Sequence, residues 1–386
     1  MRTLIVHNAY GKYSGEEAVV DAIAGVLEGH GHEVGFYRRS SEELAVSFWG
    51  KVKGFAGGVY SRSGVKGLRE AIRAFKPDVV NVHNVYPLIS PAALFECKKA
   101  GVPVVMTIHN YRLICPTGLF MRKGRPCEEC LTRGNEWGCV RHNCEHSLGK
   151  SVGYALRNYV ARQTSALNKC VDIFSCITDF QRTKLIEAGY PENKIRVNPN
   201  FYDVGQEPNY TTRDYVAYCG RLSSEKGYDL LIEAARKLPG VEIRFAGAIR
   251  EGAAPLQLPN VKYLGHISGE SYIEFVRISR FLVMPSRCYE GFPMAILEAA
   301  AQGKPCVAPD HGGFTEIIGK GDAAIGRLFK PNDTASLAEA INTLWNSPQE
   351  VEELGRKAYR KLKTKYSSER FYERFTAICK DLGVRC

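Results

Sequence analysis

Two glutamates separated by seven residues are the most informative pair in the sequence. Glu290 lies in the stretch 285–293, which follows an apolar run, and Glu298 comes a little over one turn into an expected helix. A carboxylate can accept two hydrogen bonds from the vicinal hydroxyls of a ribose or hexose. Backbone N–H groups at a loop and helix start can bind hydroxyls or an anion. The alternative is two solvated glutamates at the ends of a surface turn, and the spacing alone favours neither.

A basic pair lies in the stretch 220–227, directly after the apolar run 215–219. Arg221 carries a forked set of donors and Lys226 a compact charge, so the two can hold a diphosphate without a metal. They would also stabilise the charge that develops on a departing nucleoside diphosphate. An Arg and a Lys on a solvated loop are the alternative. The sequence contains no Asp-x-Asp, the paired carboxylates that a metal-dependent transferase normally needs, which indicates metal-independent donor binding.

His109 stands at the carboxyl end of the apolar run 102–108 and is followed by polar residues. A lone histidine in a strand is more often a core residue, but this position predicts a side chain that points into a cleft. The glycine-containing stretch 11–17 follows the first expected strand. It lacks the third glycine and the spacing of a dinucleotide-binding fingerprint.

Residues 115–146 form a cysteine-rich segment. A Cys-x2-Cys pair followed by a second Cys/His group is typical of tetrahedral zinc, and metal binding is favoured over disulfides in a cytosolic chain. The segment has little apolar periodicity, so we expect it to need a cross-link in order to be ordered. Reduced thiols and a disulfide are the alternatives. The residues concerned are Cys115, Cys127, Cys130, Cys139, His142, Cys144 and His146.

Apolar runs that alternate with amphipathic helices must position these residues. Runs that are apolar on both faces predict parallel sheets covered on both sides, hence an α/β fold with two doubly wound domains. Ligands of such sheets bind beyond the carboxyl ends of the strands. The expected strands are 3–8, 78–83, 102–109, 172–178, 215–220, 242–246, 261–264, 280–284 and 305–308. The expected helices are 16–29, 63–75, 90–100, 179–188, 228–237, 269–278, 294–302, 334–345 and 367–382.

Domain limits follow from the loss of periodicity near 199–212, where Pro, Asn, Asp and Gly accumulate. We expect a first domain at 1–200 and a second at 201–366, with the C-terminal segment 367–386 able to pack back on the first. A chain of 386 residues suits two domains, and 45% hydrophobic with 24% charged residues suits a globular protein.

The chain start is too quickly polar for a signal peptide and no stretch is apolar enough to span a membrane, so we expect a cytoplasmic protein. A net charge of +11 fits nucleic acid, an anionic membrane or phosphorylated ligands.

The pattern Glu290-x7-Glu298, with Gly291, Phe292 and the Ala299-Ala300-Ala301-x-Gly303 that follows, resembles the signature of GT4-type retaining glycosyltransferases. The resemblance implies a GT-B fold, in which two Rossmann-like domains face each other across a cleft.

The same resemblance implies roles for individual residues. Glu290 would lie by the donor sugar and Glu298 would hold the nucleotide ribose. Arg221 and Lys226 would bind the pyrophosphate, and His109 would lie near the anomeric centre of the donor. The other substrate-binding residues that it implies are Gly15, Gly247, His266, Gly291, Phe292, Pro293 and Glu316. Some members carry a comparable cysteine insert, which implies Cys115, Cys127, Cys130 and Cys144 as ligands of a structural zinc.

The activity that this implies is transfer of a sugar, with retention, from a nucleotide-diphosphate donor of the UDP or GDP type, with no cofactor for catalysis. The acceptor would be a lipid-linked or saccharide intermediate of cell-envelope polysaccharide or glycolipid assembly. The segment 38–76 carries nine basic residues with Phe48, Trp49, Phe55 and Tyr60 interleaved, which suits an anionic membrane surface at the inner face. A solvated helix face with core aromatics is the alternative there.

Two other functions compete with this one. A GT-B-fold epimerase or phosphorylase would act on the same donors, the first without an acceptor and the second with inorganic phosphate. A zinc-knuckle nucleic-acid-binding protein would concentrate its basic residues in one stripe. Here they are spread over both expected domains, so we expect no nucleic-acid partner.

Overall fold

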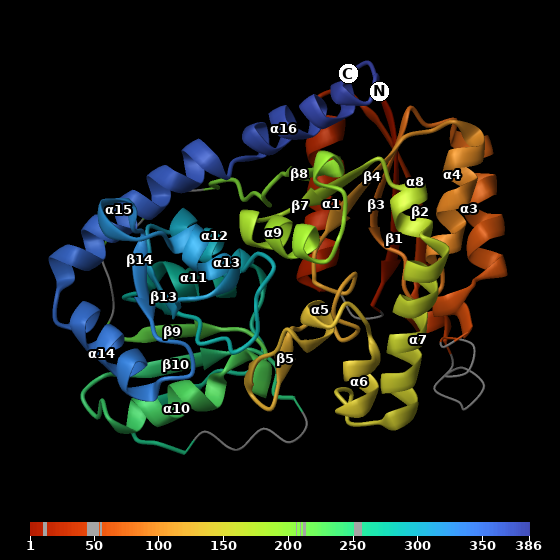
Figure 1. The fold of residues 1–386 in the computed structure, drawn as a ribbon. Helices are drawn as coiled ribbons and strands as arrows, with labels where there is room; N and C mark the ends of the chain where they lie inside the picture. The colour runs from red at the N-terminus through yellow and green to blue at the C-terminus, as the bar shows by residue number, and fades with distance from the viewer. Residues whose placement is uncertain are drawn as a thin grey trace. The chain divides into compact units, whose positions relative to one another are not determined.

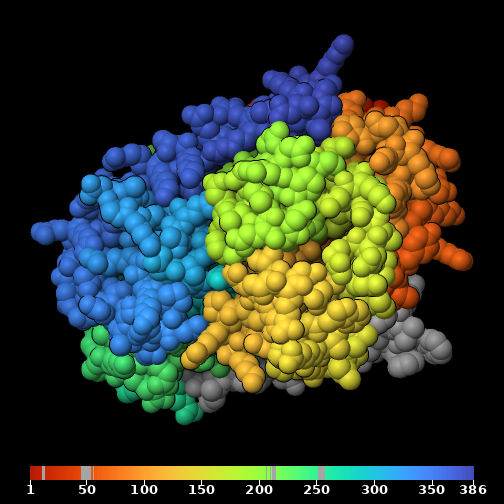
Figure 2. All heavy atoms as spheres, viewed as in Figure 1, coloured from red at the N-terminus to blue at the C-terminus, as the bar shows by residue number. Residues whose placement is uncertain are grey.

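The computed structural model describes residues 1–10, 14–44, 54, 56–205, 207, 208, 210, 214–250 and 257–386. The chain divides into two compact units (Figures 1 and 2). Unit 1 comprises Met1–Leu119, Glu128–Pro199 and Phe371–Cys386, and unit 2 comprises Phe120–Cys127 and Asn200–Arg370. The cleft between the two domains stays a prediction.

Unit 1 is built on a parallel sheet of six strands in the order β2-β1-β3-β4-β7-β8. Strands β3 and β4 are buried along their whole length because helices cover the sheet on both sides, as Figure 1 shows for α1 and α3. The strands are β1 (Arg2–Ala9), β2 (Glu33–Ser40), β3 (Val79–Asn84), β4 (Val104–Ile108), β7 (Ile173–Cys176) and β8 (Ile195–Val197). The helices are α1 (Gly15–Gly29), α3 (Arg62–Phe75), α4 (Phe95–Ala100), α5 (Glu129–Thr132), α6 (Trp137–Arg141), α7 (Leu148–Thr164), α8 (Ala166–Cys170), α9 (Asp179–Glu187) and α16 (Ser368–Asp381).

The C-terminal helix α16 contacts unit 1 through its part from Phe371 onward. The hydroxyl of Tyr372 lies 2.8 Å from Nε2 of His32, and its ring stacks on His30 at 3.6 Å between centroids. Phe371 and Phe375 are both buried.

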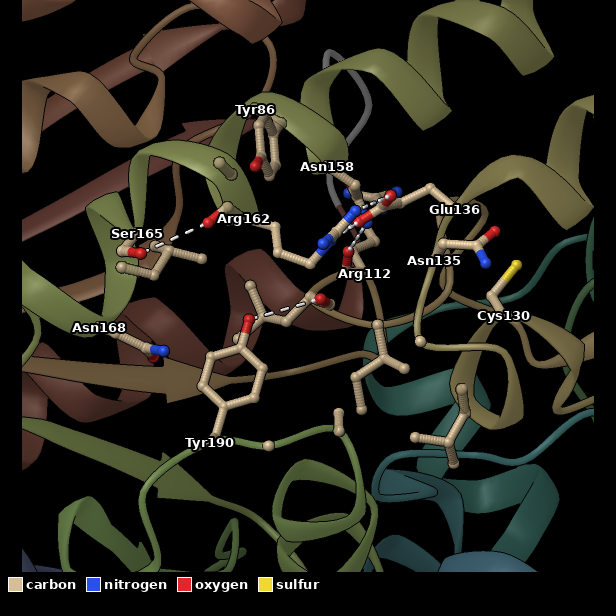
Figure 3. Close-up of a pocket in the computed structure, with 18 residues that line it drawn as sticks. Tyr86, Arg112, Cys130, Asn135, Glu136, Asn158, Arg162, Ser165, Asn168 and Tyr190 are labelled. Atoms are coloured by element: carbon tan, nitrogen blue, oxygen red, sulfur yellow. Dashed lines mark hydrogen bonds and ion pairs between the residues drawn. The ribbon is translucent and has the colours of Figure 1, made fainter.

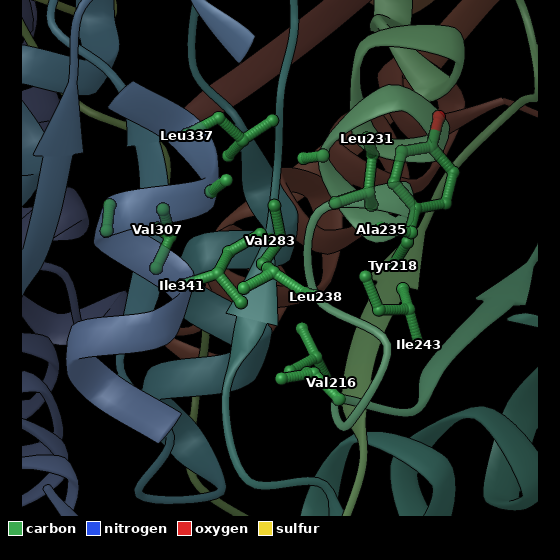
Figure 4. Close-up of a cluster of buried hydrophobic side chains, with 14 of the residues drawn as sticks. Val216, Tyr218, Leu231, Ala235, Leu238, Ile243, Val283, Val307, Leu337 and Ile341 are labelled. Carbon is green, nitrogen blue, oxygen red and sulfur yellow. The ribbon is translucent and has the colours of Figure 1, made fainter. Parts of the chain in front are cut away.

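Unit 2 is also built on a parallel sheet of six strands, in the order β11-β10-β9-β12-β13-β14. One side of this sheet packs Val216, Ile243 and Val283 against Leu231 of α10 and Ile341 of α14 (Figure 4). The strands are β9 (Val216–Cys219), β10 (Ile243–Ala246), β11 (Val261–Tyr263), β12 (Leu282–Val283), β13 (Cys306–Pro309) and β14 (Gly326–Phe329). The helices are α10 (Tyr228–Arg236), α11 (Gly269–Ile278), α12 (Met294–Ala301), α13 (Gly312–Ile318), α14 (Thr334–Trp345) and α15 (Pro348–Lys365).

A short hairpin from the cysteine-rich segment groups with unit 2. It consists of β5 (Met121–Arg122) and β6 (Arg125–Pro126), which pair in antiparallel fashion. The fully buried ring of Phe120, just before the hairpin, meets the ring of Tyr289 edge-on at 6.0 Å. The sequence analysis assigned these residues to the first domain, 1–200, whereas in the structure Phe120–Cys127 groups with unit 2.

Strands β2, β8 and β14 were absent from the sequence prediction. Strand β2 carries Arg38, Arg39 and Ser40 and is only half-buried, so it shows no continuous apolar run. Strand β8 has three residues, and β14 begins at a glycine. An edge position in the sheet explains all three, because an edge strand needs less apolar surface.

Candidate functional site

In unit 2 the sequence-predicted residues lie after neighbouring strands. The loop containing Arg221 and Lys226 follows β9, and the loop containing Glu290 follows β12, the strand beside β9 in the sheet. Gly227 has φ +67° between them, and a Cβ there would lie 2.0 Å from the carbonyl oxygen of Pro285. Only glycine allows the two loops to approach this closely.

Lys226 and Glu290 form an ion pair with 2.6 Å between Nζ and Oε1. The hydroxyl of Ser286 donates to the same carboxylate oxygen at 2.7 Å. Burial opposes the charged form of Glu290, but Lys226 and Ser286 outweigh it and lower the carboxyl pKa. Burial likewise opposes the charge on Lys226, and Glu290 outweighs it to raise the amine pKa. The pair is therefore ionised, and Glu290 can accept hydrogen bonds from hydroxyl groups.

Glu298 is held by a residue that the sequence did not single out. The Tyr272 hydroxyl of α11 donates to its Oε2. Burial raises the pKa of Glu298 more than this hydrogen bond lowers it. The carboxyl thus lies in a poorly solvated place, where hydroxyl donors such as those of a ribose would stabilise its charged form.

Arg221 is exposed and lies 3.6 Å from Oε1 of Glu225, an oxygen that Arg250 also approaches at 3.2 Å. Glu225 is buried, so one buried carboxylate faces two exposed guanidinium groups. Arg287 next to the Glu290 loop donates to Asp229 at 2.5 Å. This end of the sheet therefore carries several cations, which suits an anionic ligand.

The remaining predicted residues of unit 2 occupy varied positions. Phe292 is buried and meets Tyr366 edge-on at 5.6 Å, and Pro293 is the N-cap of α12, so both hold the loop rather than present polar groups. Gly291 is half-buried, His266 is exposed after β11, and Glu316 lies within α13. Gly247 has φ +149°, and a Cβ there would lie 1.9 Å from the carbonyl oxygen of Gly220.

In unit 1, His109 does not stand alone. Its Nε2 lies 2.7 Å from Nδ1 of His83, and the two rings stack at 5.0 Å. His7 meets the His83 ring edge-on at 6.3 Å. Burial lowers the pKa of His109 to about 4 and that of His83 well below its ordinary value. Both imidazoles are neutral near pH 7.

A carboxyl group of α1 lies beside this histidine cluster. Glu16 accepts from the Tyr10 hydroxyl at 2.9 Å and lies 3.9 Å from Nδ1 of His7. Arg112 donates to the same Tyr10 hydroxyl at 2.7 Å. Burial raises the pKa of Glu16 against the pull of Arg112. Gly15, the residue predicted here, is exposed at the start of α1.

A cavity of about 110 Å³ lies wholly within unit 1 (Figure 3). Tyr86, which follows β3, and Arg112, which follows β4, contribute to its wall, as does the ion pair of Glu136 with Arg162 at 2.8 Å. No described residue pairs with the Tyr86 hydroxyl. Mixed apolar walls with a few polar groups are typical of small-molecule sites.

The structural zinc predicted on Cys115, Cys127, Cys130 and Cys144 is not supported. Among the described residues, no group of three or more His, Cys, Asp or Glu side chains could hold a metal ion.

The segment is ordered in another way. Glu129 of α5 binds His142 at 2.7 Å, and Lys184 binds Glu128 at 3.0 Å. Helices and ion pairs therefore replace the cross-link that we expected, and the described cysteines of the segment form no disulfide.

Part of the basic segment 38–76 lies outside the described residues, namely 45–53 and 55, which include Phe48, Trp49, Lys51 and Phe55. Residues 11–13 of the glycine-containing stretch are also outside them. In the described part, Arg38 pairs with Asp21 at 2.5 Å. No helix of the described residues has the length and apolar character required to cross a membrane.

Comparison with known proteins finds two family models that match the chain. Residues 13–206 match the family model described as Glycosyltransferase Family 4, and residues 203–361 match that of Glycosyl transferases group 1. The chain is 26% identical to the glycogen synthase of Mycobacterium tuberculosis over 309 residues, which are 75% of this chain and 65% of that protein. It is 31% identical to the D-rhamnosyltransferase WbpZ of Pseudomonas aeruginosa over 159 residues, 39% of this chain and 42% of that one.

The fold is shared with Alr3699/HepE of Anabaena in complex with UDP. The TM-score is 0.67 and the identity 18%, with 99% of this chain and 100% of that one covered. Both are GT-B proteins with two Rossmann-like domains. Since the first family model covers half of the chain and the second covers most of the remainder, the protein belongs to glycosyltransferase family 4 and is a glycosyltransferase.

Proposed function

We propose that this glycosyltransferase moves a sugar, with retention, from a nucleotide-diphosphate donor to a saccharide or lipid-linked acceptor in cell-envelope polysaccharide or glycolipid biosynthesis. The observation that carries the proposal is the ionised pair of Lys226 and Glu290, together with the desolvated carboxyl of Glu298 on the helix that follows the Glu290 loop. Cations for a diphosphate and carboxylates for hydroxyl groups then lie at one end of the unit 2 sheet.

In this proposal unit 2 binds the donor and unit 1 serves the acceptor. Arg221 and Lys226 bind the diphosphate, Glu298 accepts from the ribose, and Glu290 accepts from the transferred sugar. The departing phosphate oxygen takes the proton of the attacking acceptor hydroxyl, so the C1–O bond to phosphate breaks as the new glycosidic bond forms. His109 assists by hydrogen bonding to a donor oxygen.

The UDP in the HepE structure supports a nucleotide of this type. A thermal-shift screen of UDP, GDP and their sugars tests the proposal, because a ligand at 100 times its Kd stabilises the fold by about 2.7 kcal/mol. Lys226→Ala should abolish the shift, and Lys237→Ala, an exposed lysine after α10, should retain it. Absence of a shift with every nucleotide, or equal shifts in both variants, would contradict the proposal.

Transfer itself distinguishes the alternatives. A glycosyltransferase releases nucleoside diphosphate in step with acceptor glycosylation, and the anomeric proton coupling of the product reports retention. Donor turnover that needs no acceptor would favour an epimerase, and turnover that needs inorganic phosphate would favour a phosphorylase. The family models and the relatives named above favour neither of these.

We place the acceptor in the unit 1 cavity of Figure 3 and the protein at the inner face of the membrane when that acceptor is lipid-linked. The cavity combines apolar walls with Tyr86 and Arg112, which suits a hydroxyl-rich group. Flotation with anionic vesicles that weakens with salt is the expected result for the membrane. Equal flotation with neutral vesicles would contradict it.

A further inference from the structure

Three histidines lie at the carboxyl ends of three neighbouring strands of unit 1. His7 is on β1, His83 on β3 and His109 directly after β4, and the sheet order β1-β3-β4 places His83 in the middle. His7 and His83 are almost completely buried, whereas His109 is half-buried. Only His109 is therefore open to a substrate.

The contact between His83 Nδ1 and His109 Nε2 at 2.7 Å requires one proton between the two nitrogens. Burial lowers the pKa of both rings, so each carries a single proton near neutral pH. Two arrangements satisfy this condition. Either His83 donates from Nδ1 and His109 keeps its proton on Nδ1, or His109 donates from Nε2 and His83 keeps its proton on Nε2.

The other nitrogen of His83 decides between them. Nε2 of His83 is buried and has no hydrogen-bond partner in the part of the chain that the structure describes. A proton there would be an unpaired buried N–H, which costs about 1–3 kcal/mol and is rare in proteins. The first arrangement leaves only a lone pair at that position and is favoured.

We propose that His83 is a positioning residue, which donates from Nδ1 to Nε2 of His109 and thereby fixes His109 as the Nδ1–H tautomer. His109 then offers one neutral N–H, with no other described residue bonded to it, to an oxygen of the donor substrate. It bonds that oxygen and exchanges no proton with it. This inference rests on the proposed function of His109 for its catalytic consequence, but the tautomer itself does not depend on the substrate.

Long-range ¹H–¹⁵N correlation spectra of the ligand-free protein with labelled histidine test the tautomer. His109→Asn identifies the His109 signals by their loss. We expect a protonated Nδ1 and an unprotonated Nε2 for His109, and the same for His83. Protonated Nε2 with bare Nδ1 in His109, or two protonated nitrogens, would overturn the inference.

Substitution of His83 tests its role. His83→Asn keeps an N–H donor near the place of Nδ1, whereas the carboxylate of His83→Asp can only accept and should move the His109 proton to Nε2. We expect kcat to fall about 100-fold in His83→Asp, the loss typical of one transition-state donor, and only a few-fold in His83→Asn. Unfolding curves verify that both variants fold, and the spectra of the unaltered protein remain decisive if one does not.

Substitution of His109 makes a matched pair. The amide nitrogen of Asn superposes on Nδ1 and that of Gln on Nε2, so His109→Asn should retain more activity than His109→Gln. Equal activities, or the reverse order, would overturn the inferred donor. If the spectra show the expected tautomer but no substitution of His109 alters turnover, the tautomer stands and the proposed function of His109 fails.

Discussion

The ammonium group of Lys226 and the carboxylate of Glu290 lie 2.6 Å apart, although 63 residues separate them in the chain. They meet because β9 and β12 are neighbours in the sheet and because Gly227 lets the two loops touch. Their side chains are only 25% and 14% exposed, so water solvates neither charge well and each charge is stabilised by the other. This dependence makes the stability of unit 2 sensitive to pH and to single substitutions.

Glu290→Gln should destabilise the protein by about 1–3 kcal/mol at pH 7, below the cost of breaking a fully buried pair, because Lys226 loses its carboxylate. The folded-state pKa of Glu290 is lowered, so its contribution is present above the unfolded value and is lost as pH falls through the folded value. The pKa of Lys226 is raised, so its contribution to stability is present below the unfolded value. It is lost only as pH rises through the folded value, at strongly alkaline pH.

Urea unfolding at several pH values measures both effects. The difference between wild type and Glu290→Gln should shrink in acid as Glu290 takes up a proton. Glu233→Gln is a control, because that glutamate is exposed and pairs with Arg236 at 3.5 Å on the surface. A constant difference from pH 3 to pH 7 would show that the ion pair does not contribute.

Tyr272→Phe should shift the pH dependence of nucleotide binding. Burial raises the pKa of Glu298 and the Tyr272 hydroxyl partly counters this, so loss of the hydroxyl raises the pKa further. Since the ribose contact uses the ionised carboxylate, UDP binding should weaken in acid, and in the variant this weakening should begin at a higher pH. Calorimetric titration from pH 5 to pH 8 measures it. Superimposable profiles would contradict the assigned role of Glu298.

Much of this site could be predicted from the sequence. Continuous apolar runs placed Arg221, Lys226 and Glu290 after strands, because a strand buried on both faces leaves a clear signal. No comparable sequence pattern identifies the residues that contact them. Tyr272 reaches Glu298 from α11, and Ser286 is an ordinary serine in the sequence.

The histidine cluster shows the same limit. His7, His83 and His109 lie far apart in the sequence, and only the strand order of the sheet shows that they are neighbours in space. The zinc site expected from the cysteine spacing is not supported, because no group of three or more such side chains in the described part of the chain could hold a metal ion. Ion pairs such as Lys184 with Glu128 could not be anticipated, since they join the segment to α9.

Gly227→Ala should destabilise the protein by at least about 2 kcal/mol and weaken nucleotide binding. A side chain at φ +67° is strained, and its Cβ would lie 2.0 Å from the oxygen of Pro285. The Lys226 loop must then move away from Glu290. Gly240→Ala is the matched control, because nothing lies within 4 Å of a Cβ there. Equal denaturation midpoints for the two variants would contradict this account of the loop.

Removal of metal should leave the cysteine-rich segment intact. Because the described residues form no metal-binding group, incubation with a strong chelator and a reductant should not alter Tm. Glu136→Gln should lower Tm instead, since Glu136 is 6% exposed and binds Arg162 through both oxygens at 2.8 and 3.2 Å. A fall in Tm with chelator, reversed by added zinc, would reinstate the metal site.

Tyr86→Phe tests the cavity of unit 1 as the place of the acceptor. The Tyr86 hydroxyl lines the cavity without a partner among the described residues, so it is available to an acceptor hydroxyl. Loss of one such hydrogen bond costs about 0.5–1.5 kcal/mol, which corresponds to a rise of about 2- to 10-fold in the KM for acceptor. The Kd for donor should be unchanged. Tyr60→Phe, on an exposed tyrosine of the same unit, should change neither value. A higher Kd for donor with an unchanged KM for acceptor would exclude this cavity as the acceptor site.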